Sequence, residues 1–184
     1  MKSAVALVAL AGFVFAAQDS AVLKVGQICP AFVLKTVDGS KEIKIEDFRK
    51  KEGSEGQFVV LTFWSFKCPS GEKALPDLAK VYELCKEKKV EFIGICSYGE
   101  SAEDLAKYAT DNKIDYTLLY DAETKVAKSL DPKVVTCSYI LDREGRCLYK
   151  GAYKGRKNQA GLMDALKEVL DGKEVTVKES AAKG

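Results

Sequence analysis

The stretch Phe58–Trp64 constrains the fold most, because it is an unbroken apolar run of strand length. β-branched and aromatic residues dominate it, which is typical of a strand covered on both faces, as in a parallel sheet. Apolar residues then recur at helical spacing, at Leu75, Leu78, Ala79, Tyr82 and Cys85. Residues 90–96 form a second buried run. We therefore expect a strand–helix–strand unit with a right-handed crossover, and Pro76 should kink its helix near the start.

The remaining pattern predicts elements on both sides of this unit. They are strands near residues 32–35 and 43–45, a helix that starts at 101–104, a hairpin of 137–141 and 146–150, and a helix over 162–170. The polar turn Asp142–Gly145 predicts the hairpin, and Gly172 predicts the end of the last helix. Because strands alternate with helices, the fold class is α/β, with a mixed central sheet and helices on both faces.

The first residues have the pattern of a targeting segment. Lys2 precedes the apolar run 3–17, which is short for a membrane span of about 20 residues, and Val14–Ala16 offers a cleavage site. The expected segments are a signal peptide over 1–16, a domain over 22–177 and a flexible tail over 178–184. Export to a periplasm or out of the cell would place the cleaved chain, free of the membrane, in an oxidising compartment. An uncleaved anchor or a buried N-terminal helix is the alternative.

The chain has 184 residues, a formal net charge of +2 and no histidine. The length suits one domain with a core of its own. The near-neutral charge lacks the excess of basic residues that is typical of nucleic-acid-binding proteins. The lack of histidine excludes Ser-His-Asp and Cys-His catalysis and histidine metal ligands. Six cysteines are present without a Cys-x-x-Cys pair, which argues against a zinc site. No cofactor, whether metal, flavin, nicotinamide or haem, is expected.

Cys68 is the cysteine whose position favours chemistry. It follows the strand at 58–64 where a helix begins, and the carboxyl edge of a parallel sheet is the usual place for α/β sites. Unpaired backbone N–H groups and the positive end of the helix dipole meet there, and both favour the nucleophilic thiolate. Lys67 adds a positive charge, whereas Glu72 opposes it. The alternative is a buried, unreactive side chain.

Several spaced segments resemble thioredoxin-fold redoxins. Residues 58–76 resemble the active-site strand and helix of the AhpC/TSA group and of exported thiol–disulfide reductases. Residues 25–32, 90–95 and 139–145 resemble that group's N-terminal Gly-x-x-x-Pro-x-Phe segment, its second core strand and its hairpin. The resemblance covers residues 24–177 and implies a thioredoxin-like three-layer α/β/α sandwich with extra N-terminal strands. It also implies a thiol oxidoreductase with a role in antioxidant defence or redox homeostasis.

The active-site motif differs from that of dithiol reductases and from that of peroxiredoxins. A dithiol reductase has its second cysteine at the position of Gly71, a buried acid at that of Ala74 and a cis-proline at that of Thr136. A peroxiredoxin has a proline at the position of Leu61 and an activating arginine near Thr136, while Ser65 retains the hydroxyl position of that family. The resemblance therefore implies a single active-site cysteine and leaves peroxide and disulfide substrates both open.

Cys137 is a candidate resolving thiol. It is the first residue of the strand expected after the loop of Thr136, at the same end of the sheet as Cys68. A disulfide between Cys68 and Cys137 needs their Cα atoms to lie within about 7 Å of each other. The alternative is that Cys137 faces the core, away from the site. Ser65 and Thr136 could donate hydrogen bonds to a thiolate or a bound peroxide. Trp64 could line an apolar substrate groove or pack in the core.

Three functions remain open. In the first, an exported thiol oxidoreductase, Cys68 attacks a peroxide or a protein disulfide, and Cys137, another cysteine or an external thiol of a thioredoxin-type reductant resolves the product. The second is a catalytically degraded redoxin fold that binds partner proteins beside the altered site. The third is an exported domain held by disulfides that do not exchange. An unreactive Cys68 in a folded protein would favour the second, and disulfides that resist mild reductant would favour the third.

Overall fold

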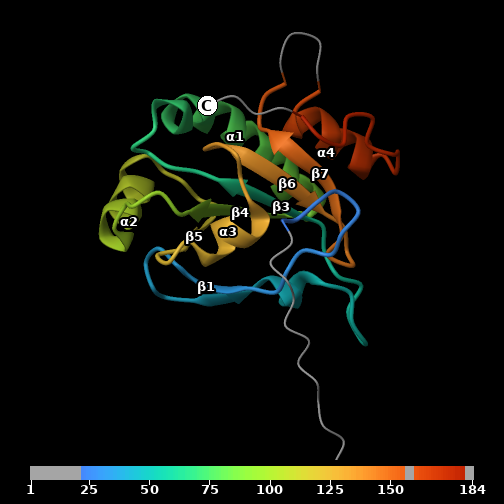
Figure 1. Ribbon diagram of the computed structural model, residues 1–184, viewed down its shortest axis with the longest axis horizontal. Coiled ribbons are helices and arrows are strands. Elements are labelled where there is room, and N and C mark those ends of the chain that lie inside the picture. The colour runs from blue at the N-terminus through green and yellow to red at the C-terminus, as the bar shows by residue number, and fades with distance from the viewer. Residues whose placement is uncertain (1–21, 156–159, 181–184) are drawn as a thin grey trace, which may run out of the picture.

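Seven strands form one mixed sheet in the part of the chain that the structure describes (Figure 1). The computed structural model describes residues 22–155 and 160–180, so the predicted signal peptide lies outside it. In chain order the elements are β1 (Val33–Thr36), β2 (Glu42–Lys44), the 3-10 turn η1 (Ile45–Phe48), β3 (Val59–Phe63), α1 (Pro69–Lys88), β4 (Glu91–Cys96), α2 (Ala102–Asp111), β5 (Thr117–Tyr120), α3 (Lys125–Leu130), β6 (Cys137–Leu141), β7 (Cys147–Ala152) and α4 (Leu162–Leu170).

The centre of the sheet is a parallel unit. The strand order is β2-β1-β5-β4-β3-β6-β7, and β3, β4 and β5 run parallel to one another. β6 pairs antiparallel with β3, and its hairpin partner β7 extends that edge. β1 and β2 extend the other edge in antiparallel pairing. The carboxyl ends of the three parallel strands and the start of β6 consequently meet at one end of the sheet, where α/β proteins place their sites.

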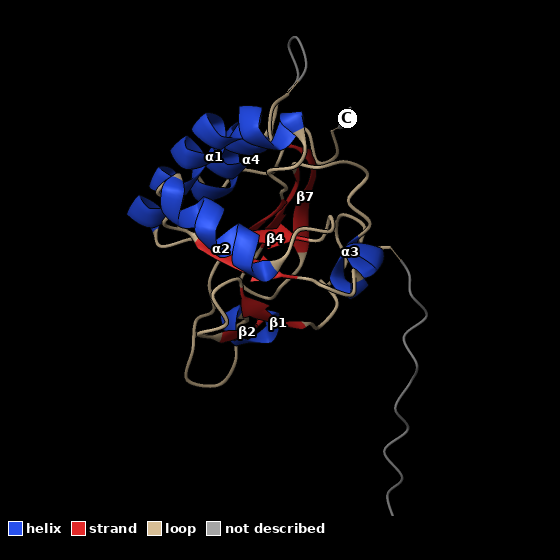
Figure 2. Ribbon diagram, turned by 90° about the vertical axis from the view of Figure 1, so that its left-hand side faces the viewer, coloured by secondary structure: helices blue, strands red, loops and turns tan. Residues whose placement is uncertain are grey.

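Helices cover both faces of the sheet. α1, α2 and α4 bury their apolar sides against one face, and α3 packs against the other together with the N-terminal segment (Figure 2). Trp64 and Leu78 belong to the core under α1, whereas Phe63, Val126 and Cys137 belong to the core under α3. Successive residues of a central strand thus enter opposite cores. This is the three-layer α/β/α arrangement that the sequence predicts.

The structure agrees with the predicted element order and adds to it. The hairpin and the last helix are present, and Ser101 caps α2 by accepting the Asp104 N–H at 3.0 Å. The prediction is wrong in lacking β5 and α3, because elements of four and six residues are too short for a hydrophobic period to stand out. α1 continues through Pro76 as one helix, and Ala79, which was expected on its buried face, is exposed.

The end of the described chain pairs with β7. Glu179 forms a parallel bridge with Lys150, and the Ser180 N–H donates to the Lys150 carbonyl at 3.2 Å. The Ser180 hydroxyl accepts the Ala152 N–H at 2.9 Å. The expected tail therefore begins with residues that are held against the sheet. Among the residues described, no helix combines the length and the apolar character that crossing a membrane requires.

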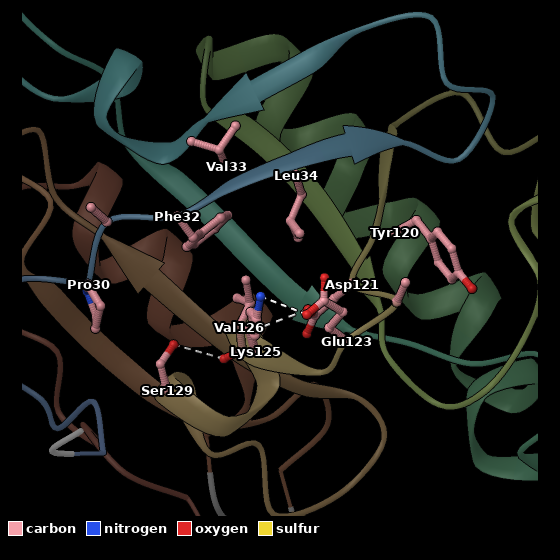
Figure 3. Close-up of a pocket in the computed structure, with 12 residues that line it drawn as sticks. Pro30, Phe32, Val33, Leu34, Tyr120, Asp121, Glu123, Lys125, Val126 and Ser129 are labelled. Atoms are coloured by element: carbon pink, nitrogen blue, oxygen red, sulfur yellow. Dashed lines mark hydrogen bonds and ion pairs between the residues drawn. The ribbon is translucent and has the colours of Figure 1, made fainter.

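A buried aspartate connects β5 to α3. The Asp121 carboxylate accepts the N–H groups of Val126 and Ala127 at 3.3 and 2.9 Å and the Ser97 hydroxyl at 2.9 Å. Figure 3 shows it in the wall of a groove of about 450 Å³ between the β1 segment and α3. Both carboxylate oxygens have donors, which offsets the cost of burying the group. Asp121 is therefore a structural carboxylate.

Replacement of Asp121 by alanine should destabilise the fold. The change leaves two backbone N–H groups of α3 and one hydroxyl without their acceptor, so we expect the free energy of unfolding to fall by about 1–3 kcal/mol. Urea denaturation followed by circular dichroism measures this loss. Glu123→Ala, an exposed position in the same groove, is the matched control. Equal stability of the two variants would contradict the assignment.

Candidate active site

Cys68 lies where the backbone turns from β3 into α1. It is the N-cap residue of the 20-residue helix, has extended backbone angles (φ −102°, ψ 123°) and is followed by Pro69, which suits the first helical position. Its carbonyl accepts the N–H groups of Gly71 at 2.8 Å and Glu72 at 3.3 Å. Its side chain makes no capping hydrogen bond. The thiol group therefore stands at a helix N-terminus, where the helix dipole favours a negative charge.

Cys68 is the most accessible of the six cysteines. All six are free thiols, and Cys68 is half-buried whereas the other five are buried. Burial raises the pKa of the Cys29, Cys85 and Cys147 thiols to about 12. Burial also raises the pKa of the thiols of the remaining two, Cys96 and Cys137. Because the thiolate is the nucleophile, the five buried cysteines are poor nucleophiles in the folded protein.

A tight junction fixes the start of α1 against the end of β3. The fully buried Trp64 donates its indole N–H to the Gly71 carbonyl at 3.0 Å. A Cβ atom on residue 71 would lie 1.8 Å from the Ser65 carbonyl oxygen, far inside van der Waals contact. Only glycine fits this position without a backbone shift. The site of the second cysteine in a dithiol motif is therefore closed to any side chain in this conformation.

Aromatic side chains surround this junction. The rings of Phe66 and Tyr108 stack with centroids 4.8 Å apart and planes 9° from parallel, and Trp64 packs against both. Trp64 has no exposed surface, so it supports the junction from within the core. Its predicted contact with a substrate stays a prediction. Phe66 and Tyr108, which are partly exposed, offer the apolar surface that was expected of Trp64.

The loop after β4 packs against the loop that carries Cys68. The Ser65 hydroxyl donates to the Glu100 carboxylate, and the Lys67 ammonium donates to the Gly99 carbonyl at 2.9 Å. Burial, together with the nearby Cys137, Cys68 and Glu100, raises the pKa of the Tyr98 hydroxyl to about 12. Residues 98–100 thus form a second wall of the site. Sequence reasoning did not single them out, because nothing in a Tyr-Gly-Glu tripeptide signals a contact with residues 65–68.

The structure places Thr136 and Cys137 beside the end of β3. The Thr136 N–H donates to the Phe63 carbonyl at 2.6 Å. Thr136 has a φ of 74°, a strained value for a β-branched residue. The Cys137 side chain packs in the core under α3, on the face of the sheet opposite α1. Ser65, Thr136 and Cys137 are all buried, so their predicted contacts with substrate or with Cys68 stay predictions.

Comparison with known proteins identifies the family. The sequence profile of the AhpC/TSA family matches residues 25–150. The chain belongs to the AhpC/TSA family. It is 30% identical over 127 residues to thiol-disulfide oxidoreductase ResA of Halalkalibacterium halodurans, which is 69% of this chain and 68% of the relative. It is 23% identical over 116 residues to sporulation thiol-disulfide oxidoreductase A of Bacillus subtilis, which is 62% of this chain and 66% of the relative.

Solved structures of similar proteins confirm that this AhpC/TSA protein has a thioredoxin-like fold. An uncharacterized conserved protein from Geobacillus kaustophilus superposes with a TM-score of 0.72 at 25% identity, over 88% of this chain and 90% of that one. The thioredoxin domain of a thiol-disulfide oxidoreductase from Bacteroides vulgatus superposes with a TM-score of 0.63 at 22% identity, over 80% and 99%. The predicted fold class and the predicted family resemblance are thereby confirmed.

Gly71→Ala should disturb the junction. The methyl group overlaps the Ser65 carbonyl, so the first turn of α1 has to shift, and we expect the free energy of unfolding to fall by about 1–3 kcal/mol. Lys73→Ala, an exposed position in the same turn, should change it by less than about 0.5 kcal/mol. Urea denaturation measures both. A Gly71→Ala protein as stable as the Lys73→Ala protein would show that the junction is not tight.

Proposed function

We propose that this protein is a thiol oxidoreductase that performs thiol–disulfide exchange through Cys68. One observation carries the proposal: the most accessible of six cysteines sits at the N-terminus of a 20-residue helix, and the other five are buried. A thiolate there is stabilised by the helix dipole and open to a substrate. The two curated relatives named above are thiol-disulfide oxidoreductases, which supports the same reaction class.

The exchange has two steps. The Cys68 thiolate attacks one sulfur of a substrate disulfide, a mixed disulfide forms, and the other substrate sulfur leaves as a thiolate. A second thiolate then attacks the Cys68 sulfur of the mixed disulfide. The bond to the substrate breaks, the substrate sulfur leaves as a thiolate, and Cys68 is left in a disulfide with the attacking sulfur, from which a further thiol releases it. The burial of Cys137 in the core under α3 favours an external thiol for this second step, with the Cys68–Cys137 disulfide as the alternative.

Protein disulfides fit the surface around Cys68 better than small ones. Phe66 and Tyr108 form a stacked aromatic pair next to the loop of Cys68, and Tyr98 is 37% exposed on the neighbouring loop. Aromatic surface of this kind binds polypeptide segments well. The basic start, apolar run and small residues of 1–16 support export as the setting, because disulfide substrates persist outside the cytosol.

Two other functions use the same site. In peroxide reduction, the Cys68 thiolate would take one oxygen as a sulfenic acid and release water or an alcohol; the lone active-site cysteine favours this candidate. In the second, the altered motif, with Gly71 and Ala74 in place of cysteine and acid, would belong to a module that binds partners without chemistry. An unreactive Cys68 in a folded protein would favour that module.

The expected result is loss of exchange in Cys68→Ser. Purified residues 17–184 should reduce insulin disulfides with glutathione as the external thiol, and Cys68→Ser should lower the rate by more than about 10³-fold. Mass spectrometry should find the mixed disulfide on Cys68. Cys85→Ala, on the same helix but buried, is the matched control and should retain the rate.

Two results would overturn parts of this proposal. Equal rates of Cys68→Ser and the intact protein would exclude Cys68 as the nucleophile. Accumulation of the mixed disulfide in Cys137→Ala would show that Cys137, and no external thiol, performs the second step.

A further inference from the structure

A groove of about 420 Å³ lies at the end of the sheet opposite Cys68. Its walls are the N-terminal segment at Val25 and Gly26, the start of β7, and the end of α4 with the residues that follow it. β7 runs in the same direction as β3, because both strands pair antiparallel with β6. The start of β7 therefore lies at the amino end of β3, and the thiol chemistry proposed above does not use this groove.

The floor of the groove is apolar. The side chains that form it are those of Val25, Phe58, Leu148, Val169 and Val175. Val169 and Val175 are 7% and 5% exposed, and the other three are half-buried. Small-molecule sites have volumes of about 300–1,000 Å³, a mostly apolar lining and a few polar groups that orient the ligand. The groove has the size and the lining of such a site.

The rim of the groove carries an excess of positive charge. Arg146, Lys173 and Lys178 line the groove, and Glu174 is the one acidic residue among the described residues that do so. The two lysines are paired within the protein, because the Lys173 ammonium lies 2.9 Å from the Asp171 carboxylate and the Lys178 ammonium lies 2.5 Å from that of Glu174. Arg146 is therefore the lining residue whose charge is available to a ligand.

Two arginines of the hairpin have charges that no carboxylate of the described residues balances. Arg49 pairs with Glu46, whereas Arg143 and Arg146 form no such pair. One guanidinium nitrogen of Arg146 donates to a backbone carbonyl of the N-terminal segment at 2.6 Å, which holds the group at the rim. The Arg143 guanidinium lies 5.4 Å from the centre of the Phe58 ring, one of the floor side chains. An apolar floor beside two unbalanced guanidinium groups is complementary to an anion with an apolar tail.

We propose that this groove binds a fatty acid, with the alkyl chain on the apolar floor and the carboxylate on Arg146. A guanidinium group binds a carboxylate through two parallel hydrogen bonds, which a lysine ammonium cannot match. Arg143 adds a second positive charge beside the floor. Removal of the alkyl chain from water supplies the affinity, and the arginines select an anion. No bond is made or broken, and the inference is independent of the reaction at Cys68.

Calorimetric titration of purified residues 17–184 with dodecanoate, kept below its micelle concentration, tests the binding. We expect saturable binding of one dodecanoate per chain. Decanoate should bind about 3- to 10-fold more weakly, because it buries two CH₂ groups fewer. Dodecyltrimethylammonium has the same chain length and the opposite charge, so it should bind at least about tenfold more weakly than dodecanoate.

Arg146→Ala should weaken dodecanoate binding by about 10- to 100-fold, the range for hydrogen bonds to a charged group. Arg143→Ala should weaken it by about 2- to 5-fold, as expected of an exposed charge that acts at short range. Lys80→Ala removes an exposed positive charge from α1 and is the matched control, which should bind like the intact protein. Backbone amide shifts on binding should be largest at residues 146–148 and 169–176 and absent at 64–68.

Unchanged affinity in both arginine variants, or equal affinity for dodecanoate and dodecyltrimethylammonium, would show adsorption to an apolar surface and overturn the proposal. Amide shifts centred outside the groove would overturn its location. Sedimentation of the protein with phosphatidylglycerol vesicles, without binding of free dodecanoate, would assign the surface to a membrane and contradict a fatty-acid site. Arg146→Ala also loses its bond to the N-terminal segment, so if its stability in urea falls, Arg143→Ala decides: an affinity equal to that of Lys80→Ala overturns the proposal.

Discussion

The close contact between the end of β3 and the first turn of α1 determines where the groups of the site lie. The Trp64 indole N–H donates a hydrogen bond to the Gly71 carbonyl. Because Gly71 has no side chain, the first turn of α1 can lie directly against the Ser65 carbonyl. This places Cys68 at the N-cap, with its thiol at the positive end of the helix dipole. The same contact excludes a second cysteine one turn later. Gly71, which stands where a dithiol reductase has its second cysteine, is thus also the residue that the junction requires.

Cys68 is the one thiol of the six that is not buried. Burial raises the pKa of the other five thiols, and Gly71 and Ala74 occupy the positions where a dithiol reductase has its second cysteine and its buried acid. The loop after β4 is hydrogen-bonded to the loop of Cys68: the Ser65 hydroxyl donates to Glu100, and the Lys67 ammonium donates to the Gly99 carbonyl. Two loops at the carboxyl end of the sheet therefore form the surroundings of Cys68.

Sequence reasoning predicted the parts of this protein that depend on local pattern. The apolar run of β3, the helix behind it and the hairpin turn carry strong periodic or turn signals, and the position of Cys68 follows from them. β5 and α3 were missed because they are too short to show a period. The contact between Glu100 and Ser65 was missed because it joins two loops 35 residues apart in sequence. The burial of Trp64 depends on how α2 and α1 meet above it, which the local pattern does not encode.

Alkylation of the native protein, resolved by cysteine, tests the central claim most directly. Residues 17–184 are treated with iodoacetamide at a series of pH values from 6 to 9, and mass spectrometry gives the rate at each of the six cysteines. The account predicts rapid labelling of Cys68 alone, with the other five labelled only after denaturation, because burial raises their pKa values. Labelling of Cys68 no faster than that of Cys137 or Cys85 would contradict the claim that Cys68 is the working nucleophile.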